Sequence, residues 1–277
     1  MTPDSYGALT NIVVILLTVF YGSLITGEVL FLRREDSSKD GPNAQFFWLK
    51  FVLLLHFAVV LVRGFEVGSC PVGSRWEALS LLAFLITFLQ WLLVYISKDR
   101  STLLYGLSFA FVLQLGSATF SLTFPGEDVP VLDSVRSLHA FSALLGVAGV
   151  AVAGIHGILW ELLRQSIKRG NFGLLFNQLS SLESLSKLLK LATVISASTL
   201  TITVASAFFL VDDANRERSF GYESMATVLI WLVFSILAIF PRATHSVTVW
   251  RTWFSIGGFV VVLFVLGVIS IYGFHAG

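Results

Sequence analysis

Apolar residues run through the chain in long blocks that are separated by short polar connections. Eight blocks are long enough to cross a bilayer as helices, since about 20 apolar residues span its hydrocarbon core. The blocks cover Leu9–Leu32, Phe46–Val67, Ala78–Ile96, Leu103–Phe124, Ser137–Leu163, Leu188–Val211, Met225–Phe240 and Trp253–Phe274. The pattern therefore predicts an all-α integral membrane protein, with eight transmembrane helices forming a single polytopic membrane domain over residues 1–277.

The composition agrees with this fold class. Of the 277 residues, 56% are hydrophobic and only 13% are charged, which is far from the composition of soluble domains. No basic run suggests a nucleic-acid partner, and the single cysteine, Cys70, excludes an internal disulfide. We expect the first apolar block to remain as a helix, because the leader before it carries no lysine or arginine.

Basic residues fall on alternate connections between the blocks. Pairs such as Arg33-Arg34 and Lys168-Arg169 contrast with acidic connections such as Asp212-Asp213. Because basic loops stay on the cytoplasmic side, this alternation predicts that both termini lie outside the cytoplasm.

The long inner connection from Asn171 to Lys190 has its own periodicity. Its leucines recur at intervals of three and four residues, with serines and charges between them. We predict an amphipathic helix lying on the inner membrane surface, beginning at Ser180 or Ser181.

The fifth block is unusually rich in glycine and alanine, reading HAFSALLGVAGVAVAGIHG from His139. Small residues let helix backbones approach closely in a membrane. This block is therefore predicted to be a central packing helix.

The second block combines His56 with Arg63, seven residues further on, before the chain breaks at Gly68 and Pro71 and restarts at Trp76-Glu77. On a helix the two side chains share a face and lie about 10 Å apart along the axis. An arginine inside a bilayer needs a partner or a function. One interpretation is a flat ligand with a metal centre and acid groups, such as haem. The other is an arginine reaching the outer surface and a histidine bonded to a neighbouring helix.

Depth arguments single out two other histidines. His139 begins the fifth block and His275 ends the eighth, and the predicted topology places both near the outer face. Two histidines at one depth on different helices suit axial ligation of haem iron. His156 and His245 fall in the inner half, where structural or solvated roles are expected.

The outer connection VDDANRERSFGYESM carries Phe220 and Tyr222. These aromatic residues either cover a flat ligand held between His139 and His275 or form an ordinary interfacial belt.

The H-x6-R-x4-G-x2-P-x5-E spacing from His56 to Glu77 resembles the second and third spans of the cytochrome c assembly proteins of the CcsA/CcmC type. The segment from SLHAFSALL onward, the segment QLSSLESLSKLLKLA and the final span with its terminal histidine are also similar to that family, so the resemblance is strongest over residues 56–277. The tryptophan-rich outer signature of the family is replaced here by RSFGYES. This departure brings the chain closer to the compact eight-span HemX/YpjD-like branch.

The resemblance implies a protein of the bacterial cytoplasmic membrane that binds haem b without a covalent link and acts in cytochrome c assembly. It implies His139 and His275 as iron ligands, with contacts from His56, and we assign Arg63 to a propionate and Phe220 and Tyr222 to the ring. Expected partners are a second assembly subunit and apocytochrome c, or an enzyme of haem biosynthesis. The alternative is a HemX-like regulator or scaffold of haem biosynthesis that delivers no haem. For the first of these functions we expect a haem-handling assembly factor rather than an enzyme on its own.

Overall fold

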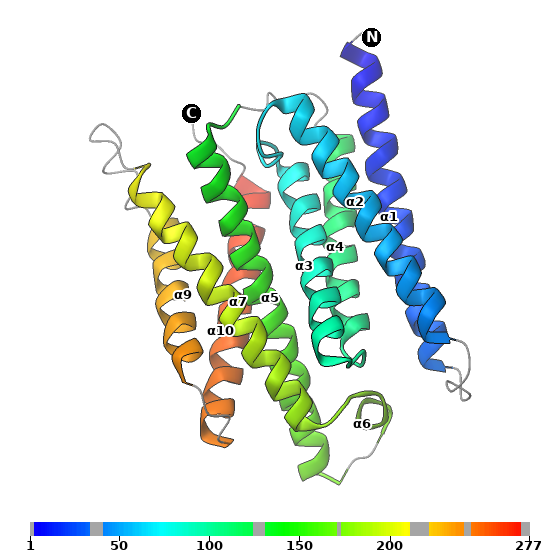
Figure 1. The fold of residues 1–277 in the computed structure, drawn as a ribbon, viewed down its shortest axis with the longest axis vertical. Coiled ribbons are helices and arrows are strands. Elements are labelled where there is room, and N and C mark those ends of the chain that lie inside the picture. Colours follow the sequence, from blue (N-terminus) through cyan, green and yellow to red (C-terminus); the bar gives the residue numbers. More distant parts are fainter. Residues whose placement is uncertain are drawn as a thin grey trace. The chain divides into compact units, whose positions relative to one another are not determined.

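The computed structural model describes residues 3–33, 41–123, 131–170, 173–210, 222–240 and 245–272. Within these ranges the chain is helical and forms no strand (Figure 1). The helices are α1 (Pro3–Arg33), α2 (Gly41–Val67), α3 (Arg75–Ser97), α4 (Leu103–Thr123), α5 (Ser134–Lys168), α6 (Leu174–Gln178), α7 (Leu182–Phe208), α9 (Tyr222–Ile239) and α10 (His245–Tyr272).

Seven of these helices are long and apolar enough to cross a membrane, which identifies a multi-pass membrane protein. They correspond to seven of the eight predicted spans. The remaining predicted span, Met225–Phe240, lies on α9, whose apolar part Met225–Ile239 is shorter than the others. The count of eight and the outer location of both termini stay predictions.

The described chain groups into two compact units. Unit 1 contains α1, α2, most of α3 and α4, with Trp91 as its last residue on α3. Unit 2 takes residues 92–102 and everything from Asp133 onward, and so contains α5, α6, α7, α9 and α10.

In unit 1, α1 packs along α2 and α4. The buried face of α1 includes Val14, Leu17, Tyr21, Leu24 and Glu28, each no more than 2% exposed. Their spacing of three and four residues places them on one side of the helix, while the positions between them face outward. A single stripe is therefore enough to attach this helix to its neighbours.

The predicted break between the second and third spans is confirmed. Helix α2 ends at Val67, and Gly68 follows with a φ of 72°. This left-handed conformation suits glycine, which has no Cβ to clash. The chain then passes Pro71 and starts α3 at Arg75, one residue before the predicted restart.

In unit 2, α5 packs along both α7 and α10, which confirms the prediction that the fifth span is a central packing helix (Figure 1). Its small residues make the contact possible. A Cβ added at Gly149 would meet Ser196 of α7, and one added at Gly154 would meet Phe259 of α10. Glycine thus sets the distance between these helix backbones.

The structure corrects the prediction of an amphipathic helix on the inner surface before the sixth span. Only the five-residue α6 is separate, and the leucine-rich stretch belongs to the start of the spanning helix α7. Ser181, one of the two predicted starts, is the N-cap, and its side chain accepts a hydrogen bond from the backbone of Ser184. No glycine or proline follows until α7 ends, so the helix continues. Leu185, Leu188 and Leu189 are 0–1% exposed and pack within the protein instead of facing lipid.

A carboxylate outside the spans anchors this end of α7. Asp99 accepts hydrogen bonds from the Ser184 hydroxyl and from the backbone of Ser101, at 3.0 Å for the latter. Burial opposes ionisation of Asp99, but hydrogen bonds from Ser180, Ser184 and Ser101 outweigh it and hold its pKa below the ordinary value. An anion beside a helix N-terminus is also favoured by the helix dipole.

We expect Gly154→Ala to destabilise the protein by about 1–3 kcal/mol, the usual cost of overpacking a core. The new methyl group would also lie 3.1 Å from the backbone oxygen of Ser255, which cannot rotate away. Gly257→Ala is the matched control, because a Cβ there meets nothing within 4 Å. Thermal unfolding in detergent measures both, and equal melting temperatures would contradict close α5–α10 packing.

Candidate functional site

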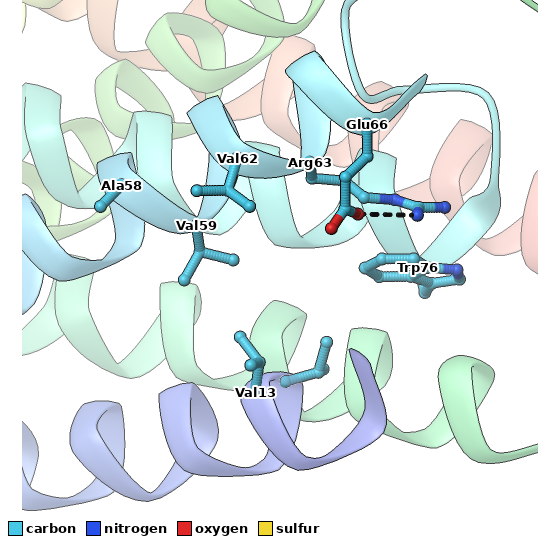
Figure 2. Close-up of a pocket in the computed structure, with 8 residues that line it drawn as sticks. Val13, Ala58, Val59, Val62, Arg63, Glu66 and Trp76 are labelled. Carbon is cyan, nitrogen blue, oxygen red and sulfur yellow. Dashed lines mark hydrogen bonds and ion pairs between the residues drawn. The ribbon is translucent and has the colours of Figure 1, made fainter. Parts of the chain in front are cut away.

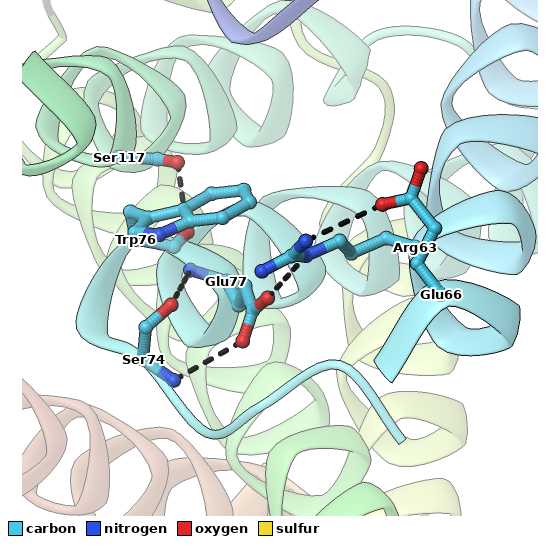
Figure 3. Close-up of polar contacts among 6 residues, drawn as sticks. All are labelled: Arg63, Glu66, Ser74, Trp76, Glu77 and Ser117. Carbon is cyan, nitrogen blue, oxygen red and sulfur yellow. Dashed lines mark hydrogen bonds and ion pairs between the residues drawn. The ribbon is translucent and has the colours of Figure 1, made fainter. Parts of the chain in front are cut away.

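The arginine expected to need a partner has two of them, both within unit 1 (Figure 3). Arg63 donates from Nε to Glu77 at 2.6 Å and from Nη1 to Glu66 at 3.3 Å. The Glu77 side chain is 1% exposed and that of Glu66 is 43% exposed. The short, shielded pair with Glu77 is therefore the stronger of the two, since solvent weakens an exposed ion pair.

Glu77 has a second role at the start of α3. Its other carboxylate oxygen accepts from the backbone N–H of Ser74 at 3.1 Å, and the Ser74 hydroxyl accepts from the backbone N–H of Glu77 at 3.3 Å (Figure 3). This reciprocal arrangement is a capping box. One buried carboxylate thus closes the first turn of α3 and holds the arginine of α2.

Trp76 completes the arrangement. The Arg63 guanidinium lies over its ring, 5.4 Å from the centroid. The backbone oxygen of Trp76 accepts from the hydroxyl of Ser117 on α4 at 2.8 Å. The end of α2, the start of α3 and the middle of α4 are consequently connected through polar contacts.

Cys70 lies in the connection between α2 and α3, outside the spanning helices. Burial, with a contribution from the negative charge of Glu77, raises the pKa of its thiol. Only the thiolate is a strong nucleophile or metal ligand. At neutral pH this cysteine therefore stays protonated and unreactive.

His56 is fully buried in unit 1, and both of its ring nitrogens are engaged. Nδ1 lies 3.0 Å from the hydroxyl of Tyr21 on α1, and Nε2 lies 3.0 Å from the hydroxyl of Ser80 on α3. Ser80 in turn donates to the side-chain oxygen of Gln114 on α4, at 3.1 Å. This chain of hydrogen bonds joins four helices and corresponds to the interpretation of His56 as bonded to neighbouring helices.

The second candidate centre is His139, near the start of α5 in unit 2. Its Nδ1 lies 3.1 Å from the backbone oxygen of Thr203 and 3.1 Å from the hydroxyl oxygen of Ser206. The Ser206 hydroxyl donates its own hydrogen to the Thr203 oxygen at 2.9 Å, so both groups act as acceptors. Nδ1 must then carry the proton of the neutral ring, and Nε2 keeps a lone pair.

Nε2 of His139 makes no hydrogen bond to any residue of the described ranges. An apolar hollow of about 420 Å³ lies between the ends of α5 and α7 and includes Ser206. The rest of its lining is Val135, Leu138, Ile202, Ala205 and Phe209. A ring nitrogen whose tautomer is set by a carbonyl is typical of metal-binding histidines.

His156 is structural, as expected. It is fully buried in unit 2, with Nδ1 2.7 Å from the backbone oxygen of Val152 and Nε2 3.1 Å from the hydroxyl of Thr102. Of the other predicted site residues, Tyr222 is the first residue of α9, and Phe220 and His275 lie outside the described residues. Among the residues described, no three His, Cys, Asp or Glu side chains form a metal-binding group.

Sequence reasoning missed two features of these sites. The capping box has a readable signal, because serine and glutamate stand three apart directly before an apolar run at Ser74 and Glu77. The acceptors of His139 have no such signal, since Thr203 and Ser206 are more than 60 residues away in the chain.

We expect Glu77→Gln to lower the free energy of unfolding by about 2–3 kcal/mol, because it leaves a partly buried guanidinium without its main counter-charge. Glu66→Gln is the control and is expected to cost less than about 1 kcal/mol, as for exposed pairs. Denaturant titration in detergent measures both variants. If they were equally stable, the shielded pair would not be the main link between α2 and α3.

Comparison of the sequence with protein-family models and with curated proteins gives no match.

Proposed function

We propose that the chain is a membrane protein that binds haem b non-covalently through His139 and handles it in cytochrome c assembly, at the outer face of the bacterial cytoplasmic membrane. The observation that carries this proposal is the contact of His139 Nδ1 with the Thr203 carbonyl oxygen and the Ser206 hydroxyl, from which we infer that the ring proton is on Nδ1. Nε2 then carries a lone pair whose direction is fixed by the ring orientation, as a histidine that binds iron requires.

A hollow lined in part by Ser206, a hydrogen-bond partner of His139, supports the same ligand, although His139 itself does not line it. The neighbouring hollow is almost wholly apolar and its volume of about 420 Å³ is in the range of small-molecule sites. An apolar wall suits the face of a porphyrin. Following the sequence resemblance, His275 would provide the second ligand, and Phe220 and Tyr222 would cover the ring. When bound, haem would supply an iron that these histidines would hold.

One observation favours a second function, that of a regulator or scaffold of haem biosynthesis that carries no haem. His56 and Arg63 are both engaged inside unit 1, by Tyr21 and Ser80 in one case and by two glutamates in the other. The positions of both residues are therefore explained by their protein partners, without a bound haem. The haem proposal rests on His139 instead of on these two residues.

The test is the absorption spectrum of the full chain, purified in mild detergent from haem-replete cells. We expect a Soret band that His139→Ala weakens and that His139→Ala with His275→Ala abolishes. His245→Ala is the control and is expected to keep the band. A band that survives the double substitution would reject these ligands, and a colourless wild-type protein would favour the regulator.

A further variant tests the orientation of the ligand without removing the ligand itself. Ser206→Ala removes one acceptor of the His139 N–H and leaves the Thr203 carbonyl in place. We expect haem retention to fall by about tenfold, the lower limit for the loss of a contact that orients a ligand. Titration of the stripped protein with haem measures it. Unchanged retention would show that the Nδ1 contacts do not orient the ligand.

A further inference from the structure

Unit 1 contains a separate hollow of about 270 Å³, which does not depend on the haem proposal (Figure 2). Five aliphatic side chains of α1 and α2 line most of it: Val13, Val14, Ala58, Val59 and Val62. The side chain of Val62 is 58% exposed, so the hollow borders the outer surface of a spanning helix. In a membrane that surface faces lipid tails.

The other end of the hollow is polar. Figure 2 shows Arg63, Glu66 and Trp76 gathered there, with the valines beyond them. The Arg63 guanidinium lies over the Trp76 ring and donates from Nη1 to Glu66. Its Nη2 makes no hydrogen bond within the described part of the chain. The hollow thus has a guanidinium and an exposed carboxylate at one end and aliphatic side chains along the rest.

The charges decide which headgroup fits. Arg63 stands between two carboxylates, Glu66 and Glu77, so the cluster carries one net negative charge. A purely anionic headgroup would face that excess charge. A headgroup with both a phosphate and a protonated amine satisfies both signs, because the phosphate accepts from Nη2 and the amine donates to Glu66. A headgroup whose amine is fully methylated has no N–H to donate.

We propose that this hollow holds one molecule of phosphatidylethanolamine, with its headgroup between Arg63 and Glu66 and an acyl chain along Val59 and Val62. The apolar slot would bind the acyl chain through the hydrophobic effect. The ion cluster selects the headgroup. The bound lipid would fill the space between α1 and α2 and seal the end of α2 against water.

Native mass spectrometry tests the proposal on the full chain in mild detergent, incubated with an equimolar mixture of phosphatidylethanolamine, phosphatidylglycerol and phosphatidylcholine. We expect one phosphatidylethanolamine to be retained in preference to the other two lipids. Glu66→Gln should reduce its retention by about fivefold and remove the preference, as expected for the loss of one partly exposed charge contact. Glu183→Gln is the matched control at an exposed glutamate of unit 2 and should change nothing.

Val59→Trp fills the slot and should abolish retention, whereas Leu61→Trp, at an exposed position of the same helix outside the hollow, should not. A melting curve of each variant shows whether it is folded. Glu66→Gln alters only an exposed side chain and provides the test if Val59→Trp does not fold. The proposal is overturned if the wild type shows no headgroup preference, or if folded Val59→Trp retains the lipid as the wild type does. His139→Ala should retain the lipid, so failure of the haem proposal leaves this result unaffected.

Discussion

The carboxylate of Glu77 is the constraint on which unit 1 depends. It is 1% exposed, and a buried charge is tolerated only where its oxygens are paired. One oxygen accepts a hydrogen bond from the Arg63 guanidinium of α2, and the other accepts one from the backbone N–H of Ser74 in the α3 capping box. The connection from Val67 to Arg75 must therefore bring the end of one helix and the start of the next to the same point. Gly68 and Pro71 make that turn possible.

Unit 2 is held together by a different means. Here the close approach of α5 to α7 and α10 comes from missing side chains at positions such as Gly149 and Gly154. In a membrane no hydrophobic effect drives helices together. Van der Waals contact between faces of small residues therefore stabilises the association of these helices. Polar side chains on these helices add hydrogen bonds both within a helix and between segments that are distant in the sequence. His156, for example, bonds to a carbonyl of its own helix and to Thr102.

The helices themselves could be predicted from the sequence. A long apolar segment in a bilayer must satisfy its own backbone hydrogen bonds, and a helix does so. The break at Gly68, the cap at Ser181 and the packing role of α5 could be predicted for the same local reasons. The leucines at 185, 188 and 189 were assigned to a surface helix because periodicity shows that a face is apolar, but not whether lipid or protein covers it. Asp99 and Ser184, which hold that segment in place, are 85 residues apart. Contacts of that kind leave no local pattern, and neither does the pairing of His139 with Thr203.

The acceptors of His139 also decide what this residue can do. Thr203 contributes a main-chain oxygen, which neither titrates nor rotates away, and Ser206 is already committed as a donor to that oxygen. The N–H of the ring is therefore retained at Nδ1, and any further chemistry must occur at Nε2. By contrast, both nitrogens of His56 lie against side-chain hydroxyls, and a ligand there must first separate α2 from Tyr21 or Ser80. One ring nitrogen of His139 therefore has no hydrogen-bond partner among the described residues, whereas both nitrogens of His56 have one, and this difference is why the haem proposal is placed on His139.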